Sequence, residues 1–111
     1  MPKRQPLEIR CDENGFVVTA SGSREPNASL AWDEVDTVLA YKRDLYTVDL
    51  ICLGFVTPER TIEVHEEMQG WSQLVEQLPS RLRGMPPFSG WWESVAKPPF
   101  APSVTTLYKR G

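Results

Sequence analysis

The spacing of apolar residues in this chain changes once, near residues 69–70, and that change limits the folds open to it. Before this point the chain has short segments with the patterns typical of β-strands, and after it apolar residues recur at helical spacing. The strand-like segments are 7–11, 16–20, 37–43, 45–56 and 61–66, of which 7–11 and 61–66 alternate cleanly, and the helical segment is 71–82. This order predicts an α+β fold in which an antiparallel sheet of about five strands curves around one amphipathic helix.

The first two predicted strands form a β-hairpin. Asp12-Glu13-Asn14-Gly15 separates them, and Asn-Gly favours a type I′ turn because both central residues of that turn need a positive φ. Segment 45–56 carries apolar residues on both parities, which predicts a strand covered on both faces along part of its length. Residues 29–35 predict a strand end followed by one helical turn.

The predicted helix at 71–82 has a continuous apolar face, and Pro79 marks either a kink or its last regular turn. Its predicted core-facing residues are Trp71, Leu74, Val75 and Leu78. Ser89 is expected to cap a second short helix at 90–97. An extended tail at 98–102 and an edge strand at 105–108 follow.

Length and charge restrict the class of protein. The 111 residues predict a single domain over 1–111, with a core at 5–83 and a C-terminal extension at 84–111 that packs on it. Residues 29–69 hold nine acidic and three basic side chains. Nucleic-acid-binding proteins show a clustered basic surface instead, so nucleic acid is not an expected partner.

Cysteine usage and hydropathy predict a cytoplasmic protein. Cys11 and Cys52 lie in apolar segments, which favours free buried thiols over a disulfide between them. The basic residues near the N-terminus have no apolar stretch behind them, so no signal peptide is expected. The longest uncharged apolar stretch, 50–58, is far shorter than the ~20 residues that cross a bilayer, so no integral membrane segment is expected.

Three features resemble bacterial pleckstrin-homology-like (PH-like) and GRAM-like domains. The segment Leu30–Val38 carries their apolar-x-Trp-x-x-Val stretch, in which a turn containing the Trp leads into the third strand. Tyr41-Lys42-Arg43-Asp44 follows where those domains turn into the fourth strand, and the helix beginning at Trp71 directly follows the last predicted strand. The resemblance covers about residues 5–83. It implies a strongly curved antiparallel sheet of five to seven strands, capped by the C-terminal helix.

The sequence departs from this family in two respects. A full pleckstrin-homology fold has seven strands before its helix, whereas five are predicted here. Members that bind phosphoinositides carry Lys and Arg in the first hairpin loop, where this chain has Asp12 and Glu13. Carboxylates repel phosphate, so phosphoinositide binding through this loop is not expected.

No catalytic, metal or cofactor site is predicted. His65 is the chain's one histidine, and its expected partner is a surface salt bridge with Glu63 on the same strand face. A zinc site needs three or four ligands. The chain has no phosphate-binding glycine motif and no Gly-x-Ser-x-Gly. Paired carboxylates lie in turns or at element ends, where capping is the expected use of Asp33.

The aromatic residues of the C-terminal extension are candidate partner-binding residues. Trp91 and Trp92 are adjacent, so on a helix they project ~100° apart and cannot both face the same core. We expect one to be buried and the other to be partly exposed. Phe100 follows in a proline-rich segment. Either this extension completes the core, or it offers an apolar contact surface to a partner or a second copy.

The favoured function is therefore a non-enzymatic protein-interaction module with a PH-like fold. In size, acidity and lack of catalytic motifs the chain also resembles small bacterial proteins that neutralise toxins as immunity partners. Under that alternative it inhibits a basic toxin through its acidic block, with Asp33, Glu34 and Asp36 as candidate contact residues. A small enzyme subunit, with a site formed from His65 and carboxylates across an oligomer, is the remaining alternative.

Overall fold

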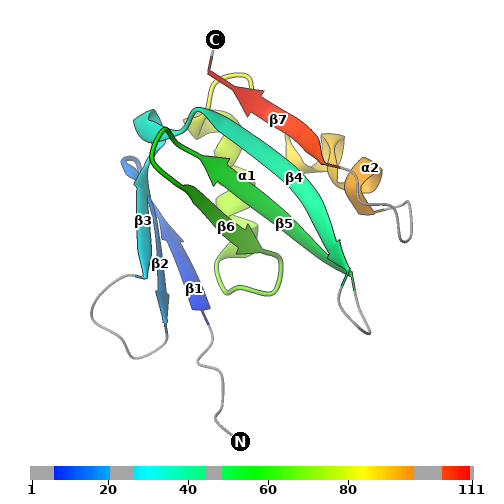
Figure 1. Ribbon diagram of the computed structural model, residues 1–111, viewed down its shortest axis with the longest axis horizontal. Coiled ribbons are helices and arrows are strands. Elements are labelled where there is room, and N and C mark those ends of the chain that lie inside the picture. Colours follow the sequence, from blue (N-terminus) through cyan, green and yellow to red (C-terminus); the bar gives the residue numbers. More distant parts are fainter. Residues whose placement is uncertain (1–6, 21–26, 45–48, 97–103, 111) are drawn as a thin grey trace, which may run out of the picture.

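The computed structural model describes residues 7–20, 27–44, 49–96 and 104–110. These ranges contain seven strands, two α-helices and two short 3-10 helices (Figure 1). The strands are β1 (Leu7–Cys11), β2 (Gly15–Ala20), β3 (Ala28–Ala31), β4 (Thr37–Asp44), β5 (Asp49–Val56), β6 (Thr61–His65) and β7 (Thr105–Lys109). The helices are η1 (Trp32–Glu34), α1 (Trp71–Arg81), η2 (Phe88–Gly90) and α2 (Trp92–Ala96). The predicted α+β class is confirmed.

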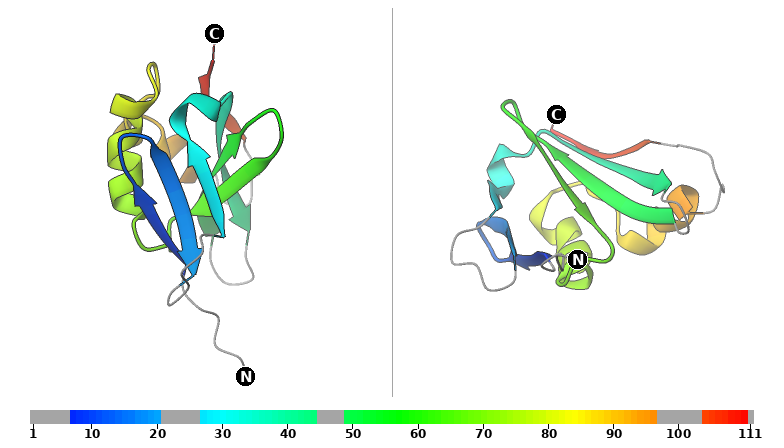
Figure 2. Two further views of the ribbon diagram at one scale, coloured as in Figure 1. Left: turned by 90° about the vertical axis from the view of Figure 1, so that its left-hand side faces the viewer. Right: turned by 60° about the horizontal axis from the view of Figure 1, so that its bottom comes forward.

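The strands form two antiparallel sheets, so the single sheet predicted from the sequence is wrong. One sheet has the order β1-β2-β3 and the other has the order β6-β5-β4-β7. Figure 2 shows the two sheets from two further directions. The division occurs after η1, where the Asp36 N–H donates to the carbonyl of Val56 (2.8 Å). This bond starts β4 beside β5 instead of beside β3.

The β1–β2 hairpin is confirmed, but its glycine acts differently from the prediction. The positive-φ glycines of the described residues are Gly70 and Gly84, so Gly15 does not supply the φ of a type I′ turn. Gly15 lies opposite Ala31 of β3, and a Cβ there would stand 1.9 Å from the Leu30 carbonyl oxygen. A glycine is needed at this position because β3 approaches its backbone closely.

Strand β5, the middle one of the consecutive strands β4, β5 and β6, is covered on both faces, as its apolar pattern predicts. Residues 50–55 of β5 are all buried. Leu53 and Phe55 belong to the main core cluster, whereas Cys52 has the opposite parity and is also fully buried. The predicted burial of a free Cys52 thiol is therefore confirmed, and Cys11 is free but half-buried.

The helix α1 presents the predicted residues to the core, and Pro79 lies in its last turn. The helix begins after Gly70, whose φ is 90°. A Cβ at Gly70 would stand 2.0 Å from the Ile9 carbonyl oxygen. Just before it, Gln69 is bonded to β1: the Ile9 N–H donates to the Gln69 carbonyl (2.6 Å), and the Gln69 N–H donates to the Leu7 carbonyl (3.2 Å). The start of α1 is thereby fixed against β1.

The C-terminal extension contributes to the same core cluster through Trp91, Val95 and Leu107. The strand predicted at 105–108 is confirmed as β7, which lies on the outer edge of β4. The predicted cap is wrong, because Ser89 lies inside η2 and α2 begins only at Trp92. The predicted extended tail at 98–102, with Phe100, lies outside the described residues.

Candidate functional site

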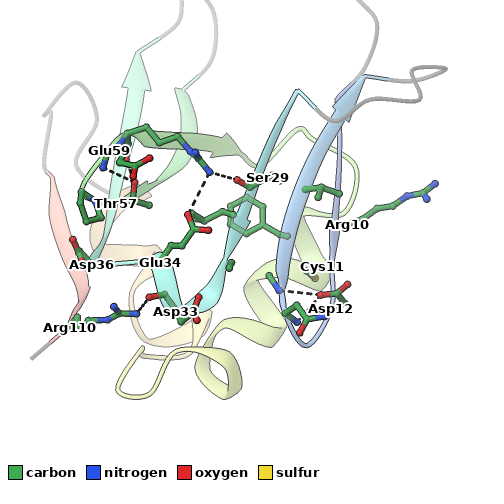
Figure 3. A pocket seen from close by; sticks show the side chains of 18 residues that line it. Arg10, Cys11, Asp12, Ser29, Asp33, Glu34, Asp36, Thr57, Glu59 and Arg110 are labelled. Atoms are coloured by element: carbon green, nitrogen blue, oxygen red, sulfur yellow. Dashed lines mark hydrogen bonds and ion pairs between the residues drawn. The ribbon is translucent and has the colours of Figure 1, made fainter.

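A cleft of about 990 Å³ opens between the three-stranded sheet and the turn that joins β5 to β6 (Figure 3). Its walls come from the β1–β2 hairpin and β3 on one side and from residues 57–60 on the other, with η1 at one end. Its charged lining residues are Asp12, Asp33, Glu34, Asp36, Glu59, Arg10, Arg60 and Arg110. We call this space the acidic cleft, since carboxylates outnumber guanidinium groups in its lining.

The hairpin wall of the acidic cleft is held by Asp12. Its carboxylate oxygen Oδ1 accepts hydrogen bonds from the backbone N–H groups of Asn14 (2.8 Å) and Gly15 (3.1 Å), as short Asp side chains commonly do in turns. The Trp32 indole Nε1–H donates to the Asp12 carbonyl (2.8 Å), and the Trp32 ring packs on Phe16 with centroids 5.6 Å apart. Trp32 therefore anchors this loop.

The structure brings Asp33, Glu34 and Asp36 together in the acidic cleft. Asp33 and Glu34 are exposed residues of η1, and Asp36 is half-buried just after it. Capping by Asp33 is not observed, because Ala31 occupies the N-cap position and no side chain bonds there. Instead, the Arg110 guanidinium donates to the Asp33 carbonyl, and the Arg110 N–H donates to the Asp36 carbonyl (2.7 Å).

Arg60 crosses the acidic cleft from the β5–β6 turn to β3. Its guanidinium Nη2 donates to the Ser29 carbonyl and lies 3.8 Å from Glu34 Oε2. The turn that carries Arg60 is held by Thr57, whose hydroxyl donates to the Arg60 carbonyl (2.9 Å) and accepts from the Arg60 N–H (3.0 Å). Backbone carbonyls thus accept hydrogen bonds from Arg60 and Arg110, and the negative charge of the cleft comes from its five carboxylates against three guanidinium groups.

The one thiol that lines the acidic cleft is that of Cys11, and its surroundings do not activate it as a nucleophile. Burial raises the pKa of this thiol, and Asp12 adds to that rise against the opposing charge of Arg81. A raised pKa keeps the thiol in its less reactive protonated form at neutral pH. No histidine is among the residues that line this cleft. Over the described ranges, no three His, Cys, Asp or Glu side chains are grouped so as to hold a metal ion.

His65 and Glu63 do not form the predicted salt bridge. Glu63 pairs with Arg43 (3.2 Å), and the Nδ1 of His65 accepts from the backbone N–H of Glu67 (3.2 Å). Close to Glu63, the pKa of the Cys52 thiol is raised to about 12, first by burial and then by the hydrogen bond and the charge of Glu63. Burial also raises the pKa of Tyr41, which lies opposite Cys52 across β4 and β5.

A second surface lies around α2, at the other end of the molecule from η1 (Figures 1 and 2). Trp91 is buried and Trp92 is 38% exposed, so the predicted division between the two tryptophans is confirmed. Phe88 contacts both: its ring meets Trp91 edge-on at 5.0 Å and stacks on Trp92 at 6.1 Å. An apolar groove of about 470 Å³ between α1 and η2 adjoins Phe88. Phe100, the third aromatic candidate, lies outside the described residues.

Sequence reasoning missed the arginines of the acidic cleft. Arg60 and Arg110 lie in a turn and near the C-terminus, and nothing in their local pattern marks them. Arg60 contacts Ser29 across 31 positions, and Arg110 contacts Asp33 across 77. The one sequence signal was the scarcity of basic residues between 29 and 69, where Arg60 is one of three.

No helix within the described ranges is long and apolar enough to cross a membrane. Comparison of the chain with protein-family models, with curated proteins and with solved structures finds no match.

Proposed function

We propose that this chain is a non-enzymatic protein-interaction module that binds a basic partner in the acidic cleft. The observation that carries the proposal is the arrangement of Asp33, Glu34 and Glu59 around a cleft of about 990 Å³ that is lined by five carboxylates and three guanidinium groups. Complementary charge increases the association rate and selects between partners. An immunity-type inhibitor of a basic toxin is the special case in which that partner is a toxin.

The PH-like fold is part of the proposal. Two antiparallel sheets of three and four strands, with α1 following β6 after a short turn, support it. The buried face of α1 shares one core cluster with residues of both sheets, which supports a helix that caps a curved β-structure. The order differs from the family pattern in one respect, because β7 follows the helix instead of preceding it.

A non-enzymatic role is supported by the burial, the raised pKa values and the positions of the cysteine and histidine side chains. The Cys52 thiol is fully buried, and the pKa of Cys11 is raised. His65 lies on β6 outside the lining of the acidic cleft, so the cleft carboxylates have no imidazole beside them. Free thiols at both cysteines support the proposed cytoplasmic location.

The aromatic surface around Trp92 remains a candidate for a second contact or for self-association. Its support is the exposed Trp92 ring stacked on Phe88, because tryptophan is enriched among residues that dominate binding energy. Sedimentation of the wild type and of Trp92→Ala at high concentration tests self-association through this surface.

Binding of poly-L-lysine of defined length, measured by titration at low and high salt, tests the acidic cleft. The double variant Glu34→Gln/Glu59→Gln should bind roughly threefold to twentyfold more weakly, because one exposed ion pair contributes up to about 1 kcal/mol. The control Glu67→Gln/Glu76→Gln removes the same charge from exposed residues outside the cleft lining. Equal loss in both variants would show that only net charge matters and would contradict the proposal.

A further inference from the structure

The two sheets each end in an unpaired edge, and the two edges face one space. Within the described residues, β3 pairs only with β2, and β6 pairs only with β5. A cavity of about 590 Å³ is lined by residues 27–29 on one side and by residues 60–63 on the other. We call this cavity the edge slot. It adjoins the acidic cleft, since Ser29 and Arg60 line both.

The hydrogen-bonding pattern shows which backbone groups point into this space. The Trp32 N–H donates to the Asn14 carbonyl (3.0 Å), and this bond continues the β2–β3 ladder. Hydrogen bonding alternates along an antiparallel strand, so the N–H and C=O groups of Ser29 and the N–H group of Ala31 point away from β2. The Ala31 carbonyl is used by η1, because Ala31 is the N-cap of that helix. By the same argument the backbone of Glu63 points away from β5, because the Thr57 N–H donates to the Arg60 carbonyl (2.8 Å) at the start of that ladder.

Among the described residues, a side chain and not a strand covers the β3 edge. The Arg60 guanidinium donates a hydrogen bond to the carbonyl of Ser29 that points away from β2, while the Arg60 side chain is 46% exposed. Its other contact, with Glu34 at 3.8 Å, is solvent-exposed and therefore contributes little stability. An incoming backbone N–H can replace the guanidinium at Ser29, and Arg60 can then remain paired with Glu34.

The surroundings of the edge slot define the chemistry of an occupant. Val18, Ile62 and Met68 line it and are buried members of the core cluster, so apolar side chains suit its inner side. On the outer side, Glu34 and Glu59 are exposed in the adjoining acidic cleft. An extended chain places successive side chains on opposite faces. A segment that alternates apolar and basic residues therefore presents its apolar side chains to the edge slot and its basic side chains to the acidic cleft.

We propose that the β3 edge binds an extended segment of a partner protein as an added strand, with apolar residues facing the edge slot and basic residues facing the acidic cleft. When this strand binds, its backbone replaces the Arg60 guanidinium at the Ser29 carbonyl. The inference rests on the proposed function, because it specifies the form in which the basic partner binds. Backbone hydrogen bonds to Ser29 and Ala31 supply affinity, and the alternating side chains supply specificity.

Synthetic heptapeptides test this proposal. The probe Lys-Val-Lys-Ile-Lys-Val-Lys is compared with Lys-Lys-Lys-Lys-Val-Ile-Val, which has the same composition but no alternation. Two further forms of the probe carry N-methyl groups, on the three apolar residues or on three lysines. N-methylation removes N–H donors and keeps every charge, so at least one of these forms should bind roughly tenfold to a hundredfold more weakly.

Variants of the protein locate the added strand. Arg60→Gln should strengthen binding of the alternating probe. The affinity of the non-alternating peptide, Lys-Lys-Lys-Lys-Val-Ile-Val, should rise only by the amount that removal of one positive charge from the cleft gives. Arg110→Gln is the matched control, because it removes a guanidinium that also bonds to a carbonyl in the cleft lining but does not cover a strand edge. In the unmodified protein, amide hydrogen exchange of Ser29 and Ala31 should slow when the alternating probe binds.

The outcomes separate this proposal from the proposed function. If all four peptides bind equally and salt weakens them equally, the acidic cleft binds basic chains without strand addition, and the strand proposal is overturned. If none of them binds, the proposed function fails as well. A dimer that forms on Arg60→Gln substitution and excludes the probe would overturn the proposal in favour of a second copy at the β3 edge.

Discussion

Replacing Gly70 by alanine should be among the most destabilising single-methyl changes in this chain. Gly70 has a φ of 90°, and the added Cβ would stand 2.0 Å from the Ile9 carbonyl oxygen and 2.9 Å from the Ile9 carbonyl carbon. Both contacts are with backbone of β1, which cannot rotate away as a side chain can. Gly84 is the matched control, because its φ is 94° and nothing lies within 4 Å of the Cβ position.

The magnitude follows from separating the two contributions. The left-handed conformation costs an alanine about 1–2 kcal/mol, and the loss of glycine's freedom in the unfolded chain returns about 0.4–1 kcal/mol. Gly84→Ala should therefore lower the unfolding free energy by about 1 kcal/mol. Gly70→Ala adds roughly 1–3 kcal/mol of overpacking and weakens the two hydrogen bonds between Gln69 and β1, each worth about 0.5–1.5 kcal/mol. Its total should be about 3–5 kcal/mol.

Urea denaturation followed by tryptophan fluorescence measures both losses. A typical domain has only about 5–15 kcal/mol of stability, so Gly70→Ala should shift the midpoint far more than Gly84→Ala does. Far-UV circular dichroism checks that both variants are folded before urea is added. Losses that agree within about 0.5 kcal/mol would refute the close approach of Gly70 to β1, since φ strain alone would then account for both.

Three further predictions concern burial. The pKa of the Cys52 thiol is raised to about 12 from 9.0, so the folded state favours the protonated form. Its contribution to stability is complete below pH 9.0 and is lost as the pH rises toward about 12, and the stability difference between wild type and Cys52→Ala should shrink over that range. A constant difference would contradict the shift. Trp91→Ala should cost about 3–5 kcal/mol and Trp92→Ala under about 1 kcal/mol in chemical denaturation, and equal losses would contradict the assigned burial. Leu74→Asp should cost several kcal/mol because it buries an unpaired charge, whereas Gln73→Asp on the exposed face should melt within a few degrees of wild type.

The strands and the main helix could be predicted because their signals are local. Alternation identified β1 and β6, and the β-rich run after Asn-Gly identified β2. Apolar residues at both odd and even positions identified the double coverage of β5. The spacing of the four core residues of α1 identified its buried face. The division into two sheets has no such signal, because it depends on Asp36 bonding to Val56 of a later strand.

The candidate site could be predicted only in part, for a similar reason. Charge alone singled out Asp33, Glu34 and Asp36, and they do line one cleft. The opposite wall and the crossing arginines come from residues distant in the sequence, so no local pattern joins them. Gly15 was recognised as necessary but for the wrong reason, since a sequence shows a glycine without showing whether a φ angle or a neighbouring strand requires it.

The place of β7 on the outer edge of β4 has a consequence for how the chain folds. Thr37 pairs with Lys109, so α1 and α2 both lie within the loop that this pairing closes. Contacts between residues so distant in sequence slow folding, because chain entropy is lost before the contacts form. During synthesis, β5 can pair with β4 as soon as it emerges from the ribosome, but the other edge of β4 stays uncovered until β7 follows. Nascent chains halted before residue 105 should therefore aggregate or recruit chaperones more readily than chains that include β7.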